Sequence, residues 1–252
     1  MRQDYLKDKI TADYAVACFQ TDIRYLLRPS AFLDLAQEIA IIGAETLNFG
    51  DKQLKPYDCA WVLARQHVRF ERPVRHADRI RMVTWHKGLD GPYFLRDYQL
   101  LDAEGNPAVN STSSWVVMNL AERRIARADF ISSIIPGAPQ SPDHAVEERA
   151  PKVNLPRGTE LEPIGEHRVL YSDVDHNRHA NNVKYTAWVM DALPQELVYE
   201  KSLRELTVNF NREVRPGETV ELFHALASDG AHIVEGRCGD RQVFIERLLF
   251  DA

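Results

Sequence analysis

The sequence predicts an α+β fold made of two similar units, each a long helix followed by an antiparallel sheet. Three observations favour this fold. A segment from Pro136 to Gly158 is rich in proline and charge, as expected of a linker, and it divides the chain. The same order of signals can be read on each side: a short strand, an apolar-periodic helix and several strands with turns between them. A stretch of the first half is also repeated in the second.

In the first half, the pattern of apolar residues predicts a strand at 14–20 and a helix at 29–47. Pro29 suits a first helical position. The residues expected on the buried face of this helix are Phe32, Leu35, Ala36, Ala40 and Ile41. Strands are then expected at 60–71, 78–86, 93–102 and 109–119.

In the second half, we expect a strand at 166–171, a helix at 181–193 that Pro194 ends, and strands at 205–213, 219–227, 232–238 and 242–250. The letters HVRFERPVRHADRI, residues 67–80, align without a gap over TVNFNREVRPGETV, residues 207–220. This match and the common element order favour duplication. We place the first domain at 1–136, the linker at 137–158 and the second domain at 159–252.

Composition excludes several classes of protein. With 44% apolar and 27% charged residues, the chain is typical of a soluble globular protein, and no apolar run approaches the length of a membrane span. The net charge of -6 argues against nucleic acid as a partner. Cys18, Cys59 and Cys238 show no CxxC spacing, so we expect a reducing compartment. The N-terminus has no apolar leader region, and the expected location is the cytoplasm.

The stretch YSDVDHNRHANNVKY, residues 171–185, carries many polar groups just before the second helix. Helix capping accounts for Asn181 or Asn182, but not for Asp175, Asn177 and His179 ahead of them. A helix N-terminus stabilises negative charge, such as develops on a thioester carbonyl under attack. The ordinary pKa of histidine lies near neutral pH, so a residue of this type at His179 can polarise that carbonyl or move protons. The pattern therefore indicates hydrolysis of an acyl group.

The letters SDVDHNRHANNVKYTAW resemble the Asp-x-Asn-x-His-x-Asn-Asn-x-x-Tyr signature of acyl-acyl-carrier-protein (acyl-ACP) thioesterases, which release free fatty acids from fatty acid synthesis. The resemblance extends over nearly the whole chain, including YLLRPSAFLDLAQEIA, WVLARQHVRFERPVRHADRIRMVTW and SSWVVMNLAERRIAR. It implies two tandem hotdog domains, each a long helix wrapped by an antiparallel sheet. It also implies that the second domain is catalytic, that the first supplies much of the acyl-chain pocket, and that no cofactor is needed. Without a transit segment, we expect a bacterial rather than a plastid enzyme.

Carried over by this resemblance, the catalytic residues are Asp175, Asn177 and His179. The family also places an acidic residue and then a cysteine on the next long strand, and these positions are Glu213 and Val214 here. Valine cannot act as a nucleophile, so a thiol mechanism is excluded.

We therefore expect Glu213 to be the general base for a water, with His179 and Asn177 holding that water or polarising the carbonyl and Asp175 orienting the network. Direct attack by a carboxylate, giving an anhydride, stays open. The first-domain counterpart of Glu213 is Pro73, so that only one copy is expected to be catalytic.

Substrate-binding roles are expected at the start of the second helix. Asn181 and Asn182 would help to hold the oxyanion, and Tyr185 belongs to the motif. Trp188, with Phe32, Leu35, Ile41 and Met190, either lines an acyl tunnel or packs in the core. A metal site at Asp175, His176 and His179 is disfavoured because no further ligand has suitable spacing.

The expected partner is an acyl carrier protein bearing a fatty acyl thioester. Such a protein is acidic, and one candidate docking face is the run that contains Arg65, Arg69, Arg72, Arg75, Arg79 and Arg81; a solvated sheet face is the alternative. Two other functions stay open: an acyl-CoA thioesterase of the same fold and a non-catalytic acyl-binding module. Arg178 between Asn177 and His179 disfavours an enoyl hydratase. Chain-length preference and oligomeric state are open, a homodimer being one possibility.

Overall fold

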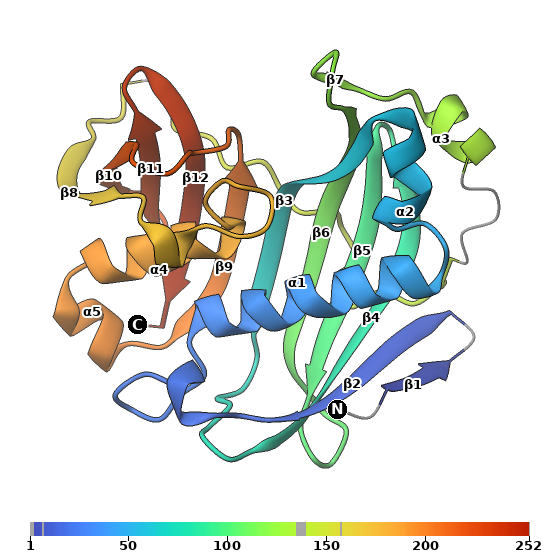
Figure 1. Ribbon diagram of the computed structural model, residues 1–252. Coiled ribbons are helices and arrows are strands. Elements are labelled where there is room, and N and C mark those ends of the chain that lie inside the picture. The colour runs from blue at the N-terminus through green and yellow to red at the C-terminus, as the bar shows by residue number, and fades with distance from the viewer. Residues whose placement is uncertain (1–2, 7, 135–139, 157, 252) are drawn as a thin grey trace. The chain divides into compact units, whose positions relative to one another are not determined.

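The computed structural model describes residues 3–6, 8–134, 140–156 and 158–251. The chain divides into two compact units, Met1–Ala150 and Pro151–Ala252. Each unit consists of a helix laid against an antiparallel sheet (Figure 1). This arrangement confirms the predicted α+β class with two helix-and-sheet repeats.

The sheet of the first unit has the strand order β1-β2-β4-β5-β6-β3, with β7 paired to β6. All of these pairings are antiparallel. The strands are β1 (Gln3–Leu6), β2 (Lys9–Ala15), β3 (Cys59–Phe70), β4 (Arg79–Asp90), β5 (Tyr93–Leu101), β6 (Pro107–Asn119) and β7 (Arg124–Ile125). The helices are α1 (Pro29–Thr46), α2 (Asp51–Leu54) and α3 (Ala128–Ile134), and short 3-10 turns lie at η1 (Cys18–Gln20) and η2 (Lys55–Tyr57).

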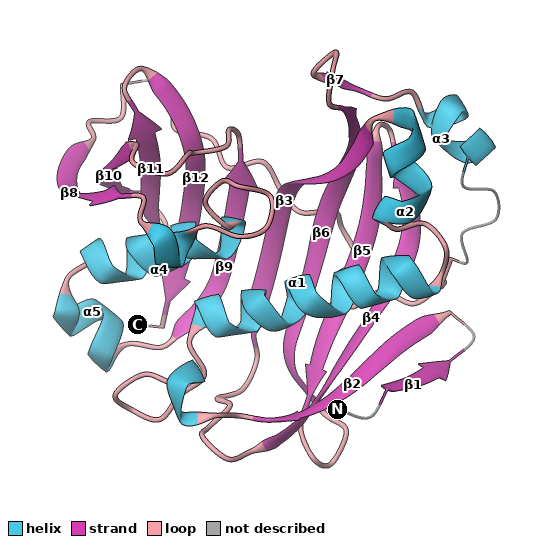
Figure 2. Cartoon of the chain, in the orientation of Figure 1, coloured by secondary structure: helices cyan, strands magenta, loops and turns pink. Residues whose placement is uncertain are grey.

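Helix α1 lies across one face of this sheet (Figure 2). Phe32 is fully buried and meets Phe70 of β3 edge to face, with ring centroids 6.2 Å apart. Gly43 allows a close approach, because a Cβ there would lie 3.0 Å from Nη1 of Arg96 on β5. The prediction for Ile41 was wrong: it is 44% exposed and Ile39 is buried instead. At 100° per residue, Ile39 follows Phe32 and Leu35 on the buried face by seven and four positions, and Ile41 falls outside it.

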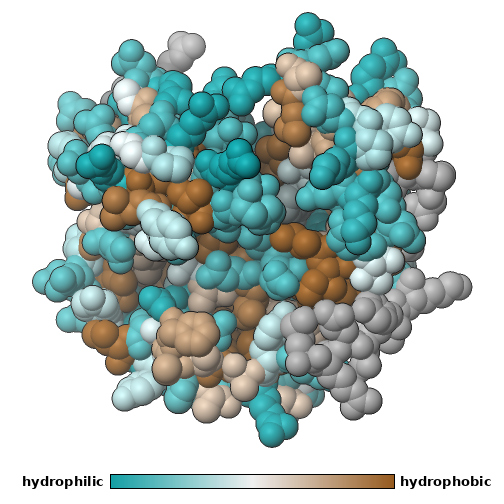
Figure 3. All heavy atoms as spheres, in the orientation of Figure 1, coloured by the Kyte–Doolittle hydropathy of each residue, from teal (hydrophilic) through white to brown (hydrophobic). Residues whose placement is uncertain are grey.

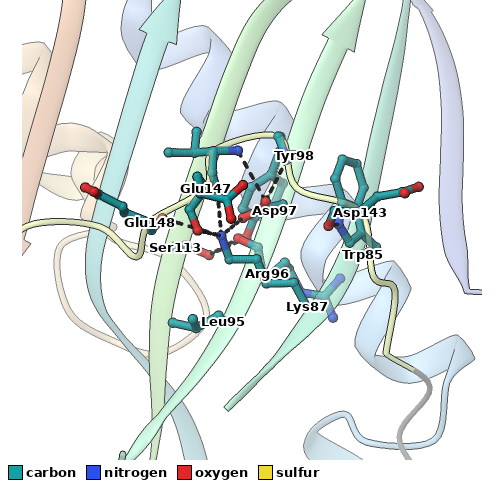
Figure 4. Close-up of polar contacts among 12 residues, drawn as sticks. Trp85, Lys87, Leu95, Arg96, Asp97, Tyr98, Ser113, Asp143, Glu147 and Glu148 are labelled. Atoms are coloured by element: carbon teal, nitrogen blue, oxygen red, sulfur yellow. Dashed lines mark hydrogen bonds and ion pairs between the residues drawn. The ribbon is translucent and has the colours of Figure 1, made fainter. Parts of the chain in front are cut away.

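Residues 140–150 run over the opposite face of the same sheet (Figure 4). Successive residues of a strand point to opposite faces. On β5, Arg96 therefore faces α1, while Asp97 accepts the Ala145 N–H at 2.8 Å. Lys87 Nζ lies 3.2 Å from Asp97 Oδ1 and donates to Val146 O at 2.5 Å, with only 2% of its side chain exposed. This buried pair fastens the segment to the sheet.

The predicted linker, 137–158, overlaps this segment. Its residues 137–139 and 157 lie outside the described residues. Residues 140–150 group with the first unit, and Pro151 begins the second. The domain boundaries drawn from the sequence, 1–136, 137–158 and 159–252, stay a prediction.

The sheet of the second unit has the strand order β9-β12-β11-β10-β8, again antiparallel throughout. The strands are β8 (Glu162–Arg168), β9 (Leu203–Phe210), β10 (Thr219–Leu226), β11 (His232–Cys238) and β12 (Arg241–Phe250). The helices are α4 (Asn182–Ala192) and α5 (Gln195–Glu200), with a 3-10 turn at η3 (Tyr171–Asp173). The second half thus repeats the plan of the first with fewer elements.

The sequence located most helices and strands, but it misplaced the first strand of each unit. Residues predicted as a strand at 14–20 form the end of β2 and the turn η1, and those at 166–171 form the end of β8 and the start of η3.

Hydrophilic residues cover much of the face shown in Figure 3, with apolar residues between them. Among the described residues, no helix has both the length and the apolar character that a membrane span requires.

Candidate active site

The polar motif of the second unit folds into a tight turn in front of α4. The N–H of Arg178 donates to Asp175 O at 3.0 Å, and the N–H of Asp175 donates to His179 O at 3.3 Å. Asp175 Oδ1 accepts the Asn177 N–H at 2.8 Å, and Oδ2 lies 3.4 Å from the Asn177 side-chain nitrogen. Asp175 therefore orients Asn177.

His179 is half-buried, and its Nδ1 lies 3.1 Å from Ala180 O. A carbonyl oxygen can only accept a hydrogen bond, so the neutral ring carries its proton on Nδ1. The other ring nitrogen, Nε2, then keeps its lone pair. In this form His179 can hold the O–H of a water or take a proton from it.

The start of α4 is capped by Asn181, whose Oδ1 accepts the Val183 N–H at 3.0 Å. The Asn181 N–H donates to Asp173 O at 2.8 Å. Asn182 is the first residue of the helix. The predicted cap is thus Asn181, and its side-chain oxygen is already occupied by the helix.

Asp173, which was not among the predicted site residues, supports the turn through buried hydrogen bonds. It accepts hydrogen bonds from His167 Nε2 at 2.9 Å, from the Leu170 N–H at 2.8 Å and from Trp188 Nε1 at 3.3 Å. Burial opposes its charge, but these hydrogen bonds, led by His167, outweigh burial and hold the pKa of Asp173 below its ordinary value. Trp188, expected at the substrate, is 3% exposed and stacks on His167 with centroids 4.4 Å apart.

Glu213 lies on the exposed segment that follows β9. Its neighbour Val214 is fully buried, and Val214 O accepts the Ala180 N–H at 2.8 Å. This bond joins the segment to the turn beside His179. Tyr185 of α4 also contacts the segment that contains Glu213, because its hydroxyl donates to Arg212 O at 3.4 Å. Its ring stacks on that of Phe244.

The acidic side chains near the turn affect the pKa of Tyr185. Burial is the largest cause that raises the pKa of Tyr185, and the carboxylates of Glu213, Glu218 and Asp175 raise it further. Tyr185 therefore stays neutral and acts as a hydrogen-bond donor.

The first unit contains the same turn in front of α1. Tyr25 N–H donates to Asp22 O at 3.0 Å, Asp22 N–H donates to Leu26 O at 2.8 Å, and Leu27 N–H donates to Val74 O at 2.8 Å. Asp22 Oδ1 also accepts the Arg24 N–H at 2.8 Å. Matching these bonds pairs Asp22 with Asp175, Arg24 with Asn177, Leu26 with His179 and Pro73 with Glu213. The predicted Pro73 correspondence is confirmed, and only the Asp of the polar set occurs in both turns.

The family is decided by two sequence models. The acyl-ACP thioesterase N-terminal domain matches residues 7–132, and the acyl-ACP thioesterase C-terminal domain matches residues 159–240. The chain belongs to the acyl-ACP thioesterase family.

Related acyl-ACP thioesterases include a chloroplastic oleoyl-acyl carrier protein thioesterase of Coriandrum sativum, 25% identical over 82% of this chain and 60% of that protein. Another, from Arabidopsis thaliana, is 26% identical over 78% of this chain and 58% of that protein. The chain therefore spans about three-fifths of the length of these relatives.

Two solved structures share the fold. An acyl-ACP thioesterase from Bacteroides thetaiotaomicron superposes with a TM-score of 0.80 at 21% identity, covering 96% of this chain and 98% of the other. The 12:0-ACP thioesterase from Umbellularia californica gives a TM-score of 0.83 at 21% identity, covering 96% and 97%. These matches confirm the tandem hotdog architecture.

No thiol lies at the turn of this acyl-ACP thioesterase family member. Cys18 is exposed in the first unit, Cys59 is buried there, and Cys238 ends β11. Within the described ranges, no cluster of three or more His, Cys, Asp or Glu side chains could hold a metal. The polar side chains at the turn are carboxylates, an amide and an imidazole.

Sequence reasoning missed Asp173 and His167, which support the turn rather than face the solvent. Asp173 and Asp175 stand two residues apart, a spacing that places both on one face of an extended segment, so the motif does not separate their roles. In the structure, Asp173 is 5% exposed and points into the unit, whereas Asp175 is half-buried and remains in the turn.

Proposed function

We propose that this chain hydrolyses the thioester of acyl-ACP, giving a free fatty acid and the holo-carrier protein in fatty acid biosynthesis. The observation that carries the proposal is the contrast between the two copies of one turn. The copy before α4 holds Asp175, Asn177 and His179 next to the Glu213 segment, and the copy before α1 holds Leu26 and Pro73 at the corresponding places. Membership of the acyl-ACP thioesterase family supports the substrate.

In the proposed reaction, Glu213 removes a proton from a water while the water oxygen attacks the thioester carbonyl carbon. His179 Nε2, left as an acceptor by the Nδ1 contact with Ala180 O, holds the second O–H of that water. Asn177, fixed by Asp175, donates from its side-chain amide to the developing oxyanion, which also lies at the N-terminus of α4. Collapse of the tetrahedral intermediate expels the pantetheine thiolate, which takes up the proton.

The domain roles follow the same proposal. The second domain, 159–252, is catalytic, and the first domain, 1–136, supplies much of the acyl-chain pocket beneath α1. The buried face of α1 offers large apolar side chains for this purpose, including Phe32 and Leu35. The partner is an acyl carrier protein that presents the acyl thioester.

The test is hydrolysis of one acyl chain presented on holo-ACP, followed by release of free fatty acid. We expect turnover by the wild type and a fall in kcat of about 10²–10⁴-fold in Glu213→Gln, which keeps the shape of the side chain but cannot accept a proton. Glu166→Gln, at an exposed position of β8, serves as the control with the same chemical change. Near-wild-type turnover by Glu213→Gln would sink the general-base role.

The same assay separates the alternatives. A higher kcat/KM on acyl-CoA than on acyl-ACP would make the chain an acyl-CoA thioesterase, and binding of acyl-ACP without any single-turnover release would make it an acyl-binding module. Retention of the fold in each variant is checked by circular dichroism.

A further inference from the structure

Three arginines stand beside the proposed catalytic residues. Arg178 directly precedes His179, Arg212 directly precedes Glu213, and Arg215 follows two residues later. All three arginines are exposed. In the described part of the chain, no carboxylate pairs with any of their guanidinium groups, whereas Arg241 and Arg247 of the same unit do have such partners.

The carboxylate nearest in sequence to Arg215 is already engaged. Glu218 accepts the backbone N–H of Arg215 at 2.6 Å and the guanidinium of Arg241 at 2.7 Å. These contacts, with the Arg215 N–H as the largest cause, lower the pKa of Glu218. Glu218 therefore shapes the turn, and the positive charge of the Arg215 side chain remains available to a partner.

Arg178 occupies a backbone position that favours other residues. Its φ of 66° lies in the left-handed region, where a residue with a Cβ costs about 1–2 kcal/mol relative to the right-handed one. Tyr25, at the same place in the other copy, has φ = 61°, so the turn itself requires this conformation. Glycine or asparagine would fit with less strain. An exposed arginine here adds a positive charge at the edge of the site.

The charge of the whole chain makes this local arrangement significant. With 31 basic and 37 acidic residues, the net charge is -6, so the chain as a whole repels an acidic partner. A carrier protein is acidic and must nevertheless bring its thioester to the site. Local positive charge beside the catalytic turn would convert repulsion into attraction at the place where docking has to occur.

We propose that Arg178, Arg212 and Arg215 form the docking surface for the acidic face of the acyl carrier protein. The proposal rests on the proposed function and adds the surface through which the substrate is delivered. It places docking on the catalytic unit, in contrast to the arginine-rich run of the first unit. Of that run, Arg72 and Arg81 already pair with Asp102 and Asp13.

The repeat supplies a matched control. Arg75 is the counterpart of Arg215: it is exposed, and its backbone N–H donates to Asp78 Oδ2 at 2.7 Å as that of Arg215 does to Glu218. Arg79 is a second exposed arginine of the first unit for which the structure gives no carboxylate partner among the described residues. The variants Arg178→Glu/Arg215→Glu and Arg75→Glu/Arg79→Glu change the net charge equally.

Each protein is assayed on one acyl chain carried by holo-ACP and by free pantetheine, over a range of salt concentrations. For Arg178→Glu/Arg215→Glu we expect kcat/KM on acyl-ACP, divided by that on acyl-pantetheine, to fall about tenfold at low salt. The difference should shrink as salt screens the charges. The control pair should keep the wild-type ratio, and Arg178→Lys/Arg215→Lys should retain most of it.

An unchanged ratio in Arg178→Glu/Arg215→Glu would overturn the proposal, as would an equal fall in both glutamate pairs. A fall confined to Arg75→Glu/Arg79→Glu would move docking to the first unit. Failure of the proposed function looks different, because the wild type would then hydrolyse neither thioester.

Discussion

Thr186 of α4 donates its hydroxyl hydrogen to Glu246 Oε1 of β12 at 2.8 Å, beneath the helix that follows the turn of Asp175 and His179. Glu246 is fully buried, and its second oxygen, Oε2, has no hydrogen-bond partner in the described part of the chain. Burial raises the pKa of Glu246 to about 8, and the Thr186 hydroxyl only partly opposes this rise. The carboxyl is therefore mostly protonated at neutral pH.

This buried carboxyl should make stability depend on pH. Between the ordinary glutamate pKa and about 8, the folded chain holds a proton that the unfolded chain has lost, so the free energy of unfolding decreases as the pH rises through this range. Above about 8 the loss is complete. Glu246→Gln removes the titrating group and should flatten this slope, which urea unfolding at pH 6, 7 and 8 would measure. Equal slopes for Glu246→Gln and the exposed control Glu166→Gln would contradict the interpretation.

Asp22 and Asp175 make the same hydrogen bond in two copies of one turn, but they should differ in function. Asp175→Ala removes the acceptor of the Asn177 N–H, and Asp22→Ala removes the acceptor of the Arg24 N–H and also that of the Leu26 N–H. We expect a loss of stability of about 1 kcal/mol for each backbone hydrogen bond removed, and therefore a larger loss for Asp22→Ala than for Asp175→Ala. Only Asp175→Ala should also lower kcat, by tenfold or more, because Asn177 is then no longer oriented. Comparable kcat values for the two variants would show that the turn contributes to folding alone.

Asp173→Asn should weaken the support of the turn that holds Asp175 and His179. The amide can replace only one acceptor oxygen of the carboxylate, whereas His167, Leu170 and Trp188 all donate to Asp173. We expect a loss of about 1–3 kcal/mol in the free energy of unfolding at pH 7. Because the pKa of Asp173 is lowered in the folded chain, this carboxylate stabilises above its unfolded pKa and less as the pH falls through the folded value. The difference between wild type and variant should therefore shrink in acid, and a constant difference would argue against a charged Asp173.

The pair of Lys87 and Asp97 should be costly to break. Asp97→Ala leaves the Lys87 ammonium buried and removes the acceptor of the Ala145 N–H, so we expect a loss of about 3–5 kcal/mol. Residues 140–150 should also become sensitive to trypsin at Arg149. The exposed pair of Arg81 and Asp13 provides the control, and Asp13→Ala should cost less than about 1 kcal/mol. Unchanged trypsin resistance in Asp97→Ala would show that other contacts hold the segment.

The fold could be predicted because the repeat and the periodicity of apolar residues are local properties of the sequence. The helix at 29–47 was expected from Pro29 and the spacing of Phe32, Leu35 and Ala36, and α1 spans Pro29–Thr46. The segment 140–150 could not be predicted, since its prolines and charges are typical of a linker. It is held by ion pairs of Asp143 with Lys9 and of Arg149 with Asp90, and by hydrogen bonds with Trp85, Lys87 and Asp97, all on strands distant in sequence.

Part of the candidate site could be predicted because its residues are close together in the sequence. Asp175, Asn177 and His179 are close in sequence, and the structure brings them together with the Glu213 segment through the bond between Ala180 and Val214. The roles of Asp173 and Trp188 depend on burial and on His167, which lies on another element. A short motif carries no signal that separates a buried carboxylate from one that remains in the turn.

The neighbours Arg96 and Asp97 limit where residues can be inserted into or deleted from this chain. One faces α1 and the other faces residues 140–150, so inserting a single residue early in β5 would exchange their faces. The aspartate would then lie beneath a helix without its lysine, and the guanidinium would meet the segment in place of the carboxylate. Insertions and deletions should therefore be tolerated in the exposed turn at 102–106, whereas selection should remove those within the strand.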